Sequence, residues 1–185
     1  MKNAKRGGGL AVLILLVAAS ETSGAYLSLR AGASYFRPSD AVFREVYGAG
    51  PSYGAELALG LGRRWEAWTS ASIFQRTGRL TFTGEETRIR LTPLFAGARY
   101  HFSRSRLQPY VGLGAGYIFY KETSPLGRTT GGSFAYVGQA GLIVKATSWL
   151  AVNLRLAYSA GRARGEDFDA ELGGLEISLG LGFGR

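Results

Sequence analysis

The stretch GLEISLGLGFG, residues 174–184, alternates large apolar side chains with small or polar ones. One phase holds Leu175, Ile177, Leu179, Leu181 and Phe183, and the other holds glutamate, serine and glycine. Strict alternation is typical of a β-strand, because successive side chains point to opposite faces. The stretch therefore predicts a strand with one face in apolar surroundings and the other packed closely against neighbours.

The same alternation recurs along the chain and gives eight segments in all. They are residues 26–36, 53–61, 66–76, 89–102, 109–121, 133–145, 150–160 and 174–184. Most have the length that a tilted strand needs to cross a bilayer. In segments 150–160 and 174–184 the bulky apolar face opposes a small or polar face, which predicts lipid outside and a packed lumen inside. A soluble barrel of lipocalin type is the alternative, and its larger apolar residues would point inward.

The connections between segments alternate in length. Those after the second, fourth and sixth segments are short, at 62–65, 103–108 and 146–149. Those after the first, third, fifth and seventh are longer, at 37–52, 77–88, 122–132 and 161–173. The chain is therefore predicted to be an all-β protein, an eight-stranded antiparallel up-and-down transmembrane β-barrel with short periplasmic turns and longer extracellular loops.

Residues 1–25 have the pattern of a secretory signal peptide. Three basic residues precede an unbroken apolar run over 10–19, and small residues follow. Cleavage is expected after Ala19 or after Ala25, which leaves residues 26–185 as the barrel domain. A membrane-anchor helix is the alternative, but a run of this length is short for one. We expect export across the inner membrane and residence in the outer membrane of a diderm bacterium.

Composition excludes several classes of function. The chain has no cysteine, so it has neither disulfides nor a cysteine zinc site. His101 is the only histidine, and the sequence indicates no metal and no cofactor. The formal net charge is +9, but the arginines are scattered through the segments and form no stripe. Nucleic-acid binding is therefore not expected.

Three glycines two residues apart, in PYVGLGAGYIFY (109–120), superficially resemble a phosphate-binding loop. Such a loop needs a strand before it and a helix after it, whereas Gly112, Gly114 and Gly116 lie within one predicted strand. We expect these glycines to face the lumen and to make room for long side chains such as Arg99 and Gln139.

The inward phase of the strands predicts a set of charged residues in the lumen. These are Arg30, Glu56, Arg99, Arg155 and Glu176. The first, second and last strands are neighbours in a closed barrel, so Arg30, Glu56 and Glu176 should lie side by side. An interlocked polar core is the main interpretation, because eight strands enclose just enough space for side chains. A narrow gate is the alternative, with weak anion preference because three arginines outnumber two glutamates.

The chain resembles the small eight-stranded outer-membrane β-barrel proteins, in the architecture of outer membrane protein W and the outer membrane protein A transmembrane domain. The resembling parts are the signal peptide, PLFAGARYHF (93–102), LQPYVGLGAGYIFY (107–120), YVGQAGLIVKATSWLAVNLRLAY (136–158) and EISLGLGFG (176–184). The resemblance implies contact with outer-membrane lipids and lipopolysaccharide, and with periplasmic chaperones and the barrel-assembly machinery. It also implies an assembly signal at Leu179, Leu181 and Phe183, although the last aromatic stands two residues before the C-terminus. A monomer is expected.

The remaining candidates are weaker. Pro93 removes a ladder donor and predicts a bulge, or a position above the bilayer, where the alternation slips in phase. His101 and Ser103 share a His-x-Ser spacing found in some lipid A deacylases, but at a periplasmic turn and without a carboxylate partner, so no enzyme is expected.

The connection 37–52 carries Phe43 and Tyr47, which suit a contact surface. The acidic connection 161–173 misses the EF-hand spacing. We expect a structural or surface-interaction protein, with a narrow passive channel as the alternative and a lipid-modifying enzyme as the least favoured.

Overall fold

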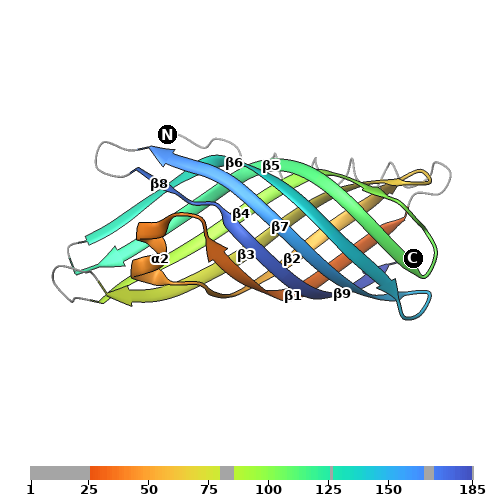
Figure 1. The fold of residues 1–185 in the computed structure, drawn as a ribbon, viewed down its shortest axis with the longest axis horizontal. Helices are drawn as coiled ribbons and strands as arrows, with labels where there is room; N and C mark the ends of the chain where they lie inside the picture. Colours follow the sequence, from red (N-terminus) through yellow and green to blue (C-terminus); the bar gives the residue numbers. More distant parts are fainter. Residues whose placement is uncertain (1–25, 80–85, 126, 165–168, 185) are drawn as a thin grey trace, which may run out of the picture.

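Eight long antiparallel strands close into a barrel (Figure 1). The computed structural model describes residues 26–79, 86–125, 127–164 and 169–184. The barrel strands are β1 (Leu27–Pro38), β2 (Gly50–Leu61), β3 (Trp65–Arg79), β4 (Glu86–His101), β5 (Leu107–Ser124), β6 (Gly127–Lys145), β7 (Leu150–Arg164) and β9 (Gly174–Gly184). Strand β9 pairs with both β7 and β1, so the barrel has no open edge and the ladder satisfies its backbone groups. The predicted fold class is confirmed.

Two short elements lie outside the eight strands. Strand β8 (Asp169–Glu171) pairs with the end of β7. Helix α2 (Ala41–Tyr47) lies at one end of the barrel, opposite the end that holds the C-terminus (Figure 1). No helix in the described part of the chain is long and apolar enough to cross a membrane.

Helix α2 begins after Asp40, which is its N-cap residue. The Asp40 carboxylate accepts a hydrogen bond from the Phe43 backbone N–H at 2.9 Å, which satisfies one free donor of the first turn. Phe43 and Tyr47, four residues apart on one helix face, are both buried. These two aromatics were expected on an outer contact surface. That expectation is wrong, because the helix turns them into the lumen.

Connection lengths are as expected at one end of the barrel and shorter than expected at the other. The turns 62–64, 102–106 and 146–149 are short. At the α2 end, β5 and β6 leave only residues 125–126 between them, so the long loop expected over 122–132 is wrong. The strands continue to pair beyond the band of exposed apolar side chains on the outer wall, because pairing satisfies backbone groups in water as well as in lipid. The tip of the β3–β4 connection lies outside the described residues.

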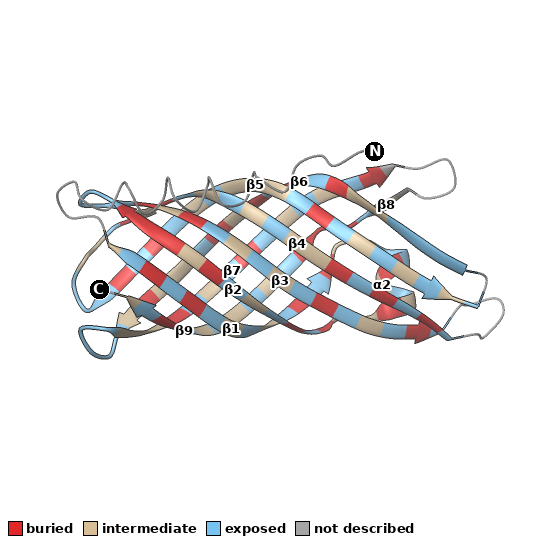
Figure 2. Cartoon of the chain, turned by 180° about the vertical axis from the view of Figure 1, so that it is seen from behind, coloured by how far each residue is buried: buried red, intermediate tan, exposed pale blue. Residues whose placement is uncertain are grey.

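Alternation of burial along the strands separates an outer from an inner face (Figure 2). On β9 the odd-numbered apolar residues are 36 to 60% exposed. Exposed aromatics flank this apolar belt. Trp65, Phe102, Trp149 and Phe183 lie at the turn end, and Tyr35, Tyr53, Tyr117, Phe119, Phe134, Tyr136 and Tyr158 lie on the α2 side. Trp149, just before β7, and Tyr158 on β7 are nine positions apart in the sequence, which at the rise and tilt of barrel strands gives a height of about 23 Å.

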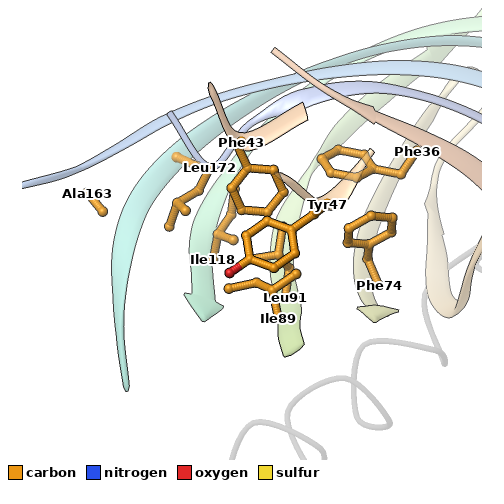
Figure 3. Packing of buried hydrophobic residues seen from close by; sticks show 10 residues of the cluster. Phe36, Phe43, Tyr47, Phe74, Ile89, Leu91, Ile118, Ala163 and Leu172 are labelled. Carbon is orange, nitrogen blue, oxygen red and sulfur yellow. The ribbon is translucent and has the colours of Figure 1, made fainter. Parts of the chain in front are cut away.

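The lumen has two chemically different halves. Near α2 it is filled by an apolar cluster in which Phe43 and Tyr47 pack on Leu91 and Ile118 (Figure 3). Toward the turn end it is filled by charged side chains. The expectation of a polar lumen is therefore right for only one half, because apolar inward residues of the extended strands cover the buried helix.

Pro93 does not mark a bulge. The registers of β4 with β3 and with β5 are unchanged on either side of it, and only the pairs 72–93 and 73–92 are missing from the β3–β4 ladder. The alternation also keeps its phase, since Ile89, Leu91 and Arg99 all face inward. The apparent slip arose because apolar residues face inward near α2 and outward near the turns.

Candidate functional site

The charged half of the lumen is built from two cross-strand pairs. Arg30 of β1 stands opposite Glu56 of β2, and Glu66 of β3 stands opposite Arg99 of β4. All four side chains point inward and are at least nine-tenths buried. The strand registers therefore deliver two arginines and two glutamates to one level of the barrel.

Arg30 bridges the two glutamates. Its Nη1 lies 2.7 Å from Glu56 Oε1 and 2.9 Å from Glu66 Oε1, and its Nη2 donates to Glu66 Oε2 at 3.1 Å. The two nitrogens face one carboxylate as a planar fork, the geometry in which arginine binds carboxylates most strongly. Strands β1, β2 and β3 are thereby linked through their side chains.

Arg99 completes the cluster from β4 and is fully buried. Its Nη2 lies 2.5 Å from Glu56 Oε1, and its Nε lies 3.2 Å from Glu66 Oε1. Its guanidinium carbon lies 4.8 Å from the Tyr110 ring centre and 5.5 Å from the Trp68 ring centre. Two aromatic faces and two carboxylates thus replace the water that this cation loses.

Arg155 of β7 carries the network across the barrel. It forms an ion pair and hydrogen bond with Glu176, and its Nη1 lies 3.6 Å from Glu56 Oε2. Its Nε also donates to Ser178 Oγ at 3.1 Å. Glu176 was expected beside Arg30, which is wrong. On β9 the residue opposite Arg30 is Gly182, so Glu176 lies six residues further along the strand.

Glu66 is a central member of the cluster that the sequence interpretation left out. It begins the segment predicted over 66–76, in the inward phase shared with Trp68 and Ser70, so strict alternation could have found it. With Glu66 included, three arginines meet three glutamates and the formal charges cancel. The predicted positive excess is therefore wrong, and with it the basis for an anion preference.

The turn end of the cluster is covered by a short chain of polar contacts. Tyr26, just before β1, donates from its hydroxyl to Glu66 Oε2 at 2.5 Å. Arg104, in the turn after β4, bonds to the Tyr26 hydroxyl and to the backbone carbonyls of Arg63 and Trp65. Burial, followed by the negative charge of Glu66, raises the pKa of Tyr26 to about 12. Tyr26 therefore stays a neutral donor at physiological pH.

His101 lies beneath this cover rather than in an open turn. It is fully buried at the end of β4, and its Nε2 lies 3.6 Å from Glu66 Oε2. The statement that His101 has no carboxylate partner is therefore wrong. Ser103, the other half of the His-x-Ser spacing, instead shares a hydrogen bond of 2.8 Å with Ser105 Oγ. The described contacts do not join the histidine and the serine.

The three glycines of β5 line the inner wall where large side chains cross it. A Cβ on Gly112 would lie 2.8 Å from Arg99 Cβ and 3.2 Å from Gln139 Nε2. A Cβ on Gly114 would lie 2.7 Å from the Trp68 indole. A Cβ on Gly116 would overlap the backbone of β4. Gly112 thus adjoins the residues that the sequence named, and Gly114 makes room for Trp68, which the sequence did not name.

A cavity of about 80 Å³ separates the two halves of the lumen. The charged residues Arg30, Glu56 and Arg155 line it on one side, and Phe36, Ile118 and Leu172 line it on the other. The Gln139 amide also lines it, and no described residue forms a hydrogen bond with that amide. A space of this volume with charged and amide groups in its wall can hold a few ordered waters.

The α2 end has a polar link of its own. The Tyr47 hydroxyl donates to Glu122 Oε1 at 2.6 Å, and Thr87 Oγ1 donates to the same carboxylate oxygen at 3.1 Å. Burial and the Glu122 hydrogen bond raise the pKa of the Tyr47 phenol above its usual range. The link ties helix α2 to strands β4 and β5 and holds it in the barrel mouth.

The arrangement of these side chains suits a closed lumen better than a catalytic site. Paired charges with hydrogen-bonded carboxylates fill the lumen at one level, and aromatic and aliphatic side chains fill it at the other. Among the described residues, no group of histidine and acidic side chains could hold a metal ion.

Comparisons with known proteins agree on the fold. No protein-family model and no curated protein match the sequence. Solved structures do match. OprG from Pseudomonas aeruginosa aligns with a TM-score of 0.69 and 15% identity, over 87% of this chain and 96% of that chain. Neisserial surface protein A aligns with a TM-score of 0.61 and 17% identity, over 87% of this chain and 97% of that chain. A third match is Ail, the attachment invasion locus protein of Yersinia pestis, crystallised with the heparin analogue sucrose octasulfate. It aligns with a TM-score of 0.60 and 15% identity, over 88% of this chain and 100% of that chain.

Proposed function

We propose that this chain, which has the fold of small eight-stranded outer-membrane β-barrels, is an integral outer-membrane protein with a closed lumen and a structural or surface-interaction role. The observation that carries the proposal is the pairing of an apolar outer belt with a filled interior. Leu113, Leu179 and Ile177 are 75%, 60% and 52% exposed, while Arg99 and Glu66 are fully enclosed. Such a molecule buries charge inside and offers hydrocarbon-like surface outside, the reverse of a soluble barrel.

The flanking aromatics support a bilayer as the surrounding phase. Tyrosine and tryptophan favour the interface between hydrocarbon and water, and here they lie on both sides of the belt. The belt height of about 23 Å agrees with the apolar band of about 25 Å in outer-membrane barrels. The signal-peptide pattern of residues 1–25 supports export to that membrane.

The orientation follows from the turns. Short turns and both ends of the barrel domain lie on one side, which we assign to the periplasm, and helix α2 with the longer connections lies on the outer side. The proposed partners are outer-membrane lipids and lipopolysaccharide, together with chaperones and the barrel-assembly machinery during biogenesis. The assembly machinery would recognise Leu179, Leu181 and Phe183 on the exposed face of β9.

Surface labelling of intact cells tests location and orientation together. The full chain, expressed in a diderm host, receives a peptide tag beside Pro125 at the α2 end or, as a matched control, beside Thr147 in a turn at the other end. The Pro125 tag should bind antibody on intact cells, and the Thr147 tag should bind only after the outer membrane is opened. Equal labelling of both tags, or recovery of the protein in the soluble fraction, would contradict the proposal.

A narrow passive channel is the second candidate, and the internal cavity favours it. The cavity of about 80 Å³ already interrupts the packing between the charged and apolar halves. Planar-bilayer recording of the refolded protein distinguishes the two candidates. A closed lumen predicts no conductance steps in the wild type, and silence in Glu56→Ala as well would eliminate the channel. Regular single-channel steps in the wild type would instead overturn the closed lumen.

A further inference from the structure

Four basic residues form one patch on the outer wall of the barrel near its α2 end. The outer-rim basic patch comprises Arg88 and Arg90 of β4, Lys121 of β5 and Arg128 of β6, all exposed. Register places them together, because Arg90 stands opposite Lys121, while Thr123 stands opposite both Arg88 and Arg128. They line a shallow hollow of about 480 Å³ together with the polar side chains of Gln75, Thr123 and Ser124.

The patch is distinctly cationic. Glu86 is the one acidic residue among the described residues that line the hollow, so four positive charges face one negative charge. None of the four cations forms a salt bridge within the described part of the chain. The acidic neighbour Glu122 points the other way, into the lumen, where Tyr47 and Thr87 bind it. Glu122 therefore does not neutralise the outer-rim basic patch.

The level of the patch along the barrel indicates its partner. Lys121 lies two residues beyond Phe119 on the same face of β5, which is about 7 Å along the strand. Tyr117 and Phe119, whose ring centres are 4.8 Å apart, belong to the aromatic belt on the α2 side. Arg90 lies beside Lys121 at the same level. Cations directly above such a belt stand where lipid headgroups begin.

We propose that the outer-rim basic patch binds the phosphate groups of the glycolipid in the outer leaflet. This inference rests on the proposed outer-membrane location. The three arginines and one lysine of the patch, on adjacent strands, can bind phosphate oxygens through forked and single charged hydrogen bonds. The acyl chains of the same lipid would lie on the exposed apolar residues below, including Leu113 and Tyr117. A soluble polyanion would use the cations alone and would gain nothing from the apolar belt.

The test compares binding of diphosphoryl lipid A to two charge-matched variants of the refolded full chain. The patch variant carries Arg88→Gln, Arg90→Gln and Lys121→Gln. The control carries Arg63→Gln, Arg106→Gln and Lys145→Gln, which removes the same charges from exposed residues at the turn end. Each protein is placed in phosphatidylcholine nanodiscs with increasing diphosphoryl lipid A, and bound lipid is counted by native mass spectrometry. Dephosphorylated lipid A, inorganic phosphate and sucrose octasulfate serve as comparison probes.

Wild type and control should bind diphosphoryl lipid A alike. The patch variant should bind it about a hundredfold more weakly, since it lacks three cations and each cation near an anionic surface contributes about fivefold. Dephosphorylated lipid A should bind weakly to all three. Equal binding by the patch variant and the control would overturn the proposal. So would competition by inorganic phosphate or sucrose octasulfate as effective as that by the lipid, which would indicate a soluble polyanion. Heat-modifiable gel migration of every variant shows whether the barrel has folded, and surface tagging tests its location independently.

Discussion

Arg99 shows how the barrel accommodates a charge with no exposed surface. Two carboxylates and the faces of Trp68 and Tyr110 surround its guanidinium. Removing a charge from water costs several kcal/mol, which an ion pair offsets only when its partners remain in place. At the scale of single residues, the balance of three arginines and three glutamates therefore matters more than any one pair.

Glu66→Gln breaks that balance and should lower the free energy of unfolding by about 3 to 5 kcal/mol, because it leaves Arg30 and Arg99 short of a counter-charge. Urea titration of the protein refolded in lipid vesicles measures the loss. Glu45→Gln, at an exposed position on helix α2, removes the same charge and should change the value by under about 0.5 kcal/mol. Similar losses in both variants would show that the cluster contributes no specific stability.

Gly114 on β5 and Gly138 on β6 supply a second matched pair of variants. Gly114→Leu would place a side chain where the Trp68 indole lies, so the barrel should fail to close. Gly138, on the neighbouring strand β6, has only Leu113 Cδ2 near its added Cβ, at 3.7 Å. Gly138→Leu should therefore fold. Heat-modifiable gel migration reports closure, and normal migration of Gly114→Leu would refute this account of the glycines.

At the scale of elements, helix α2 sets the character of the outer half of the lumen. It projects Phe43 and Tyr47 onto inward-facing residues of β3, β4 and β5 (Figure 3). The cap at Asp40 and the link from Tyr47 to Glu122 fix it at both ends. A short helix has little stability of its own, so its packing in the barrel mouth is what holds it.

Phe43→Ala should loosen the helix because it removes a buried ring, at a cost of about 3 to 5 kcal/mol. Hydrogen exchange of the α2 amides, measured by mass spectrometry, should accelerate while exchange in the β9 strand stays slow. Val42→Ala changes a neighbouring residue that is 72% exposed and serves as the control. Unchanged α2 protection in Phe43→Ala would mean that the ring does not anchor the helix.

At the scale of the whole molecule, the outer belt determines which bilayer fits. Aromatic side chains bound an apolar band of about 23 Å, which is thinner than the hydrocarbon core of about 30 Å in a typical bilayer. Mismatch costs a fraction of a kcal/mol for each ångström, through thinning of the bilayer or tilting of the protein. The barrel should therefore favour thin membranes.

Folding into phosphatidylcholine vesicles of graded acyl length tests this preference. The yield of heat-modifiable barrel should be highest in vesicles of short-chain lipids and should fall as the chains lengthen beyond the belt height. Tyr158→Ala removes one of the aromatic residues that bound the apolar belt, so it should broaden or shift the acyl length at which the folding yield is highest. Thr147→Ala, in a turn, should leave that acyl length unchanged. A yield that rises steadily with chain length would contradict the assigned belt.

Local alternation was enough to predict the eight strands, the closed antiparallel barrel, the outward apolar face and the inward position of Arg30, Glu56 and Arg99, because strand side chains alternate whatever lies around them. Which inward residues meet depends on register and stagger, and these are properties of the closed sheet. Only the tertiary structure therefore paired Glu176 with Arg155, brought Glu66 and His101 together and set Trp68 over Gly114. It also decided that residues 41–47 form a helix in the barrel mouth, since the apolar surface that stabilises this helix comes from strands distant in sequence.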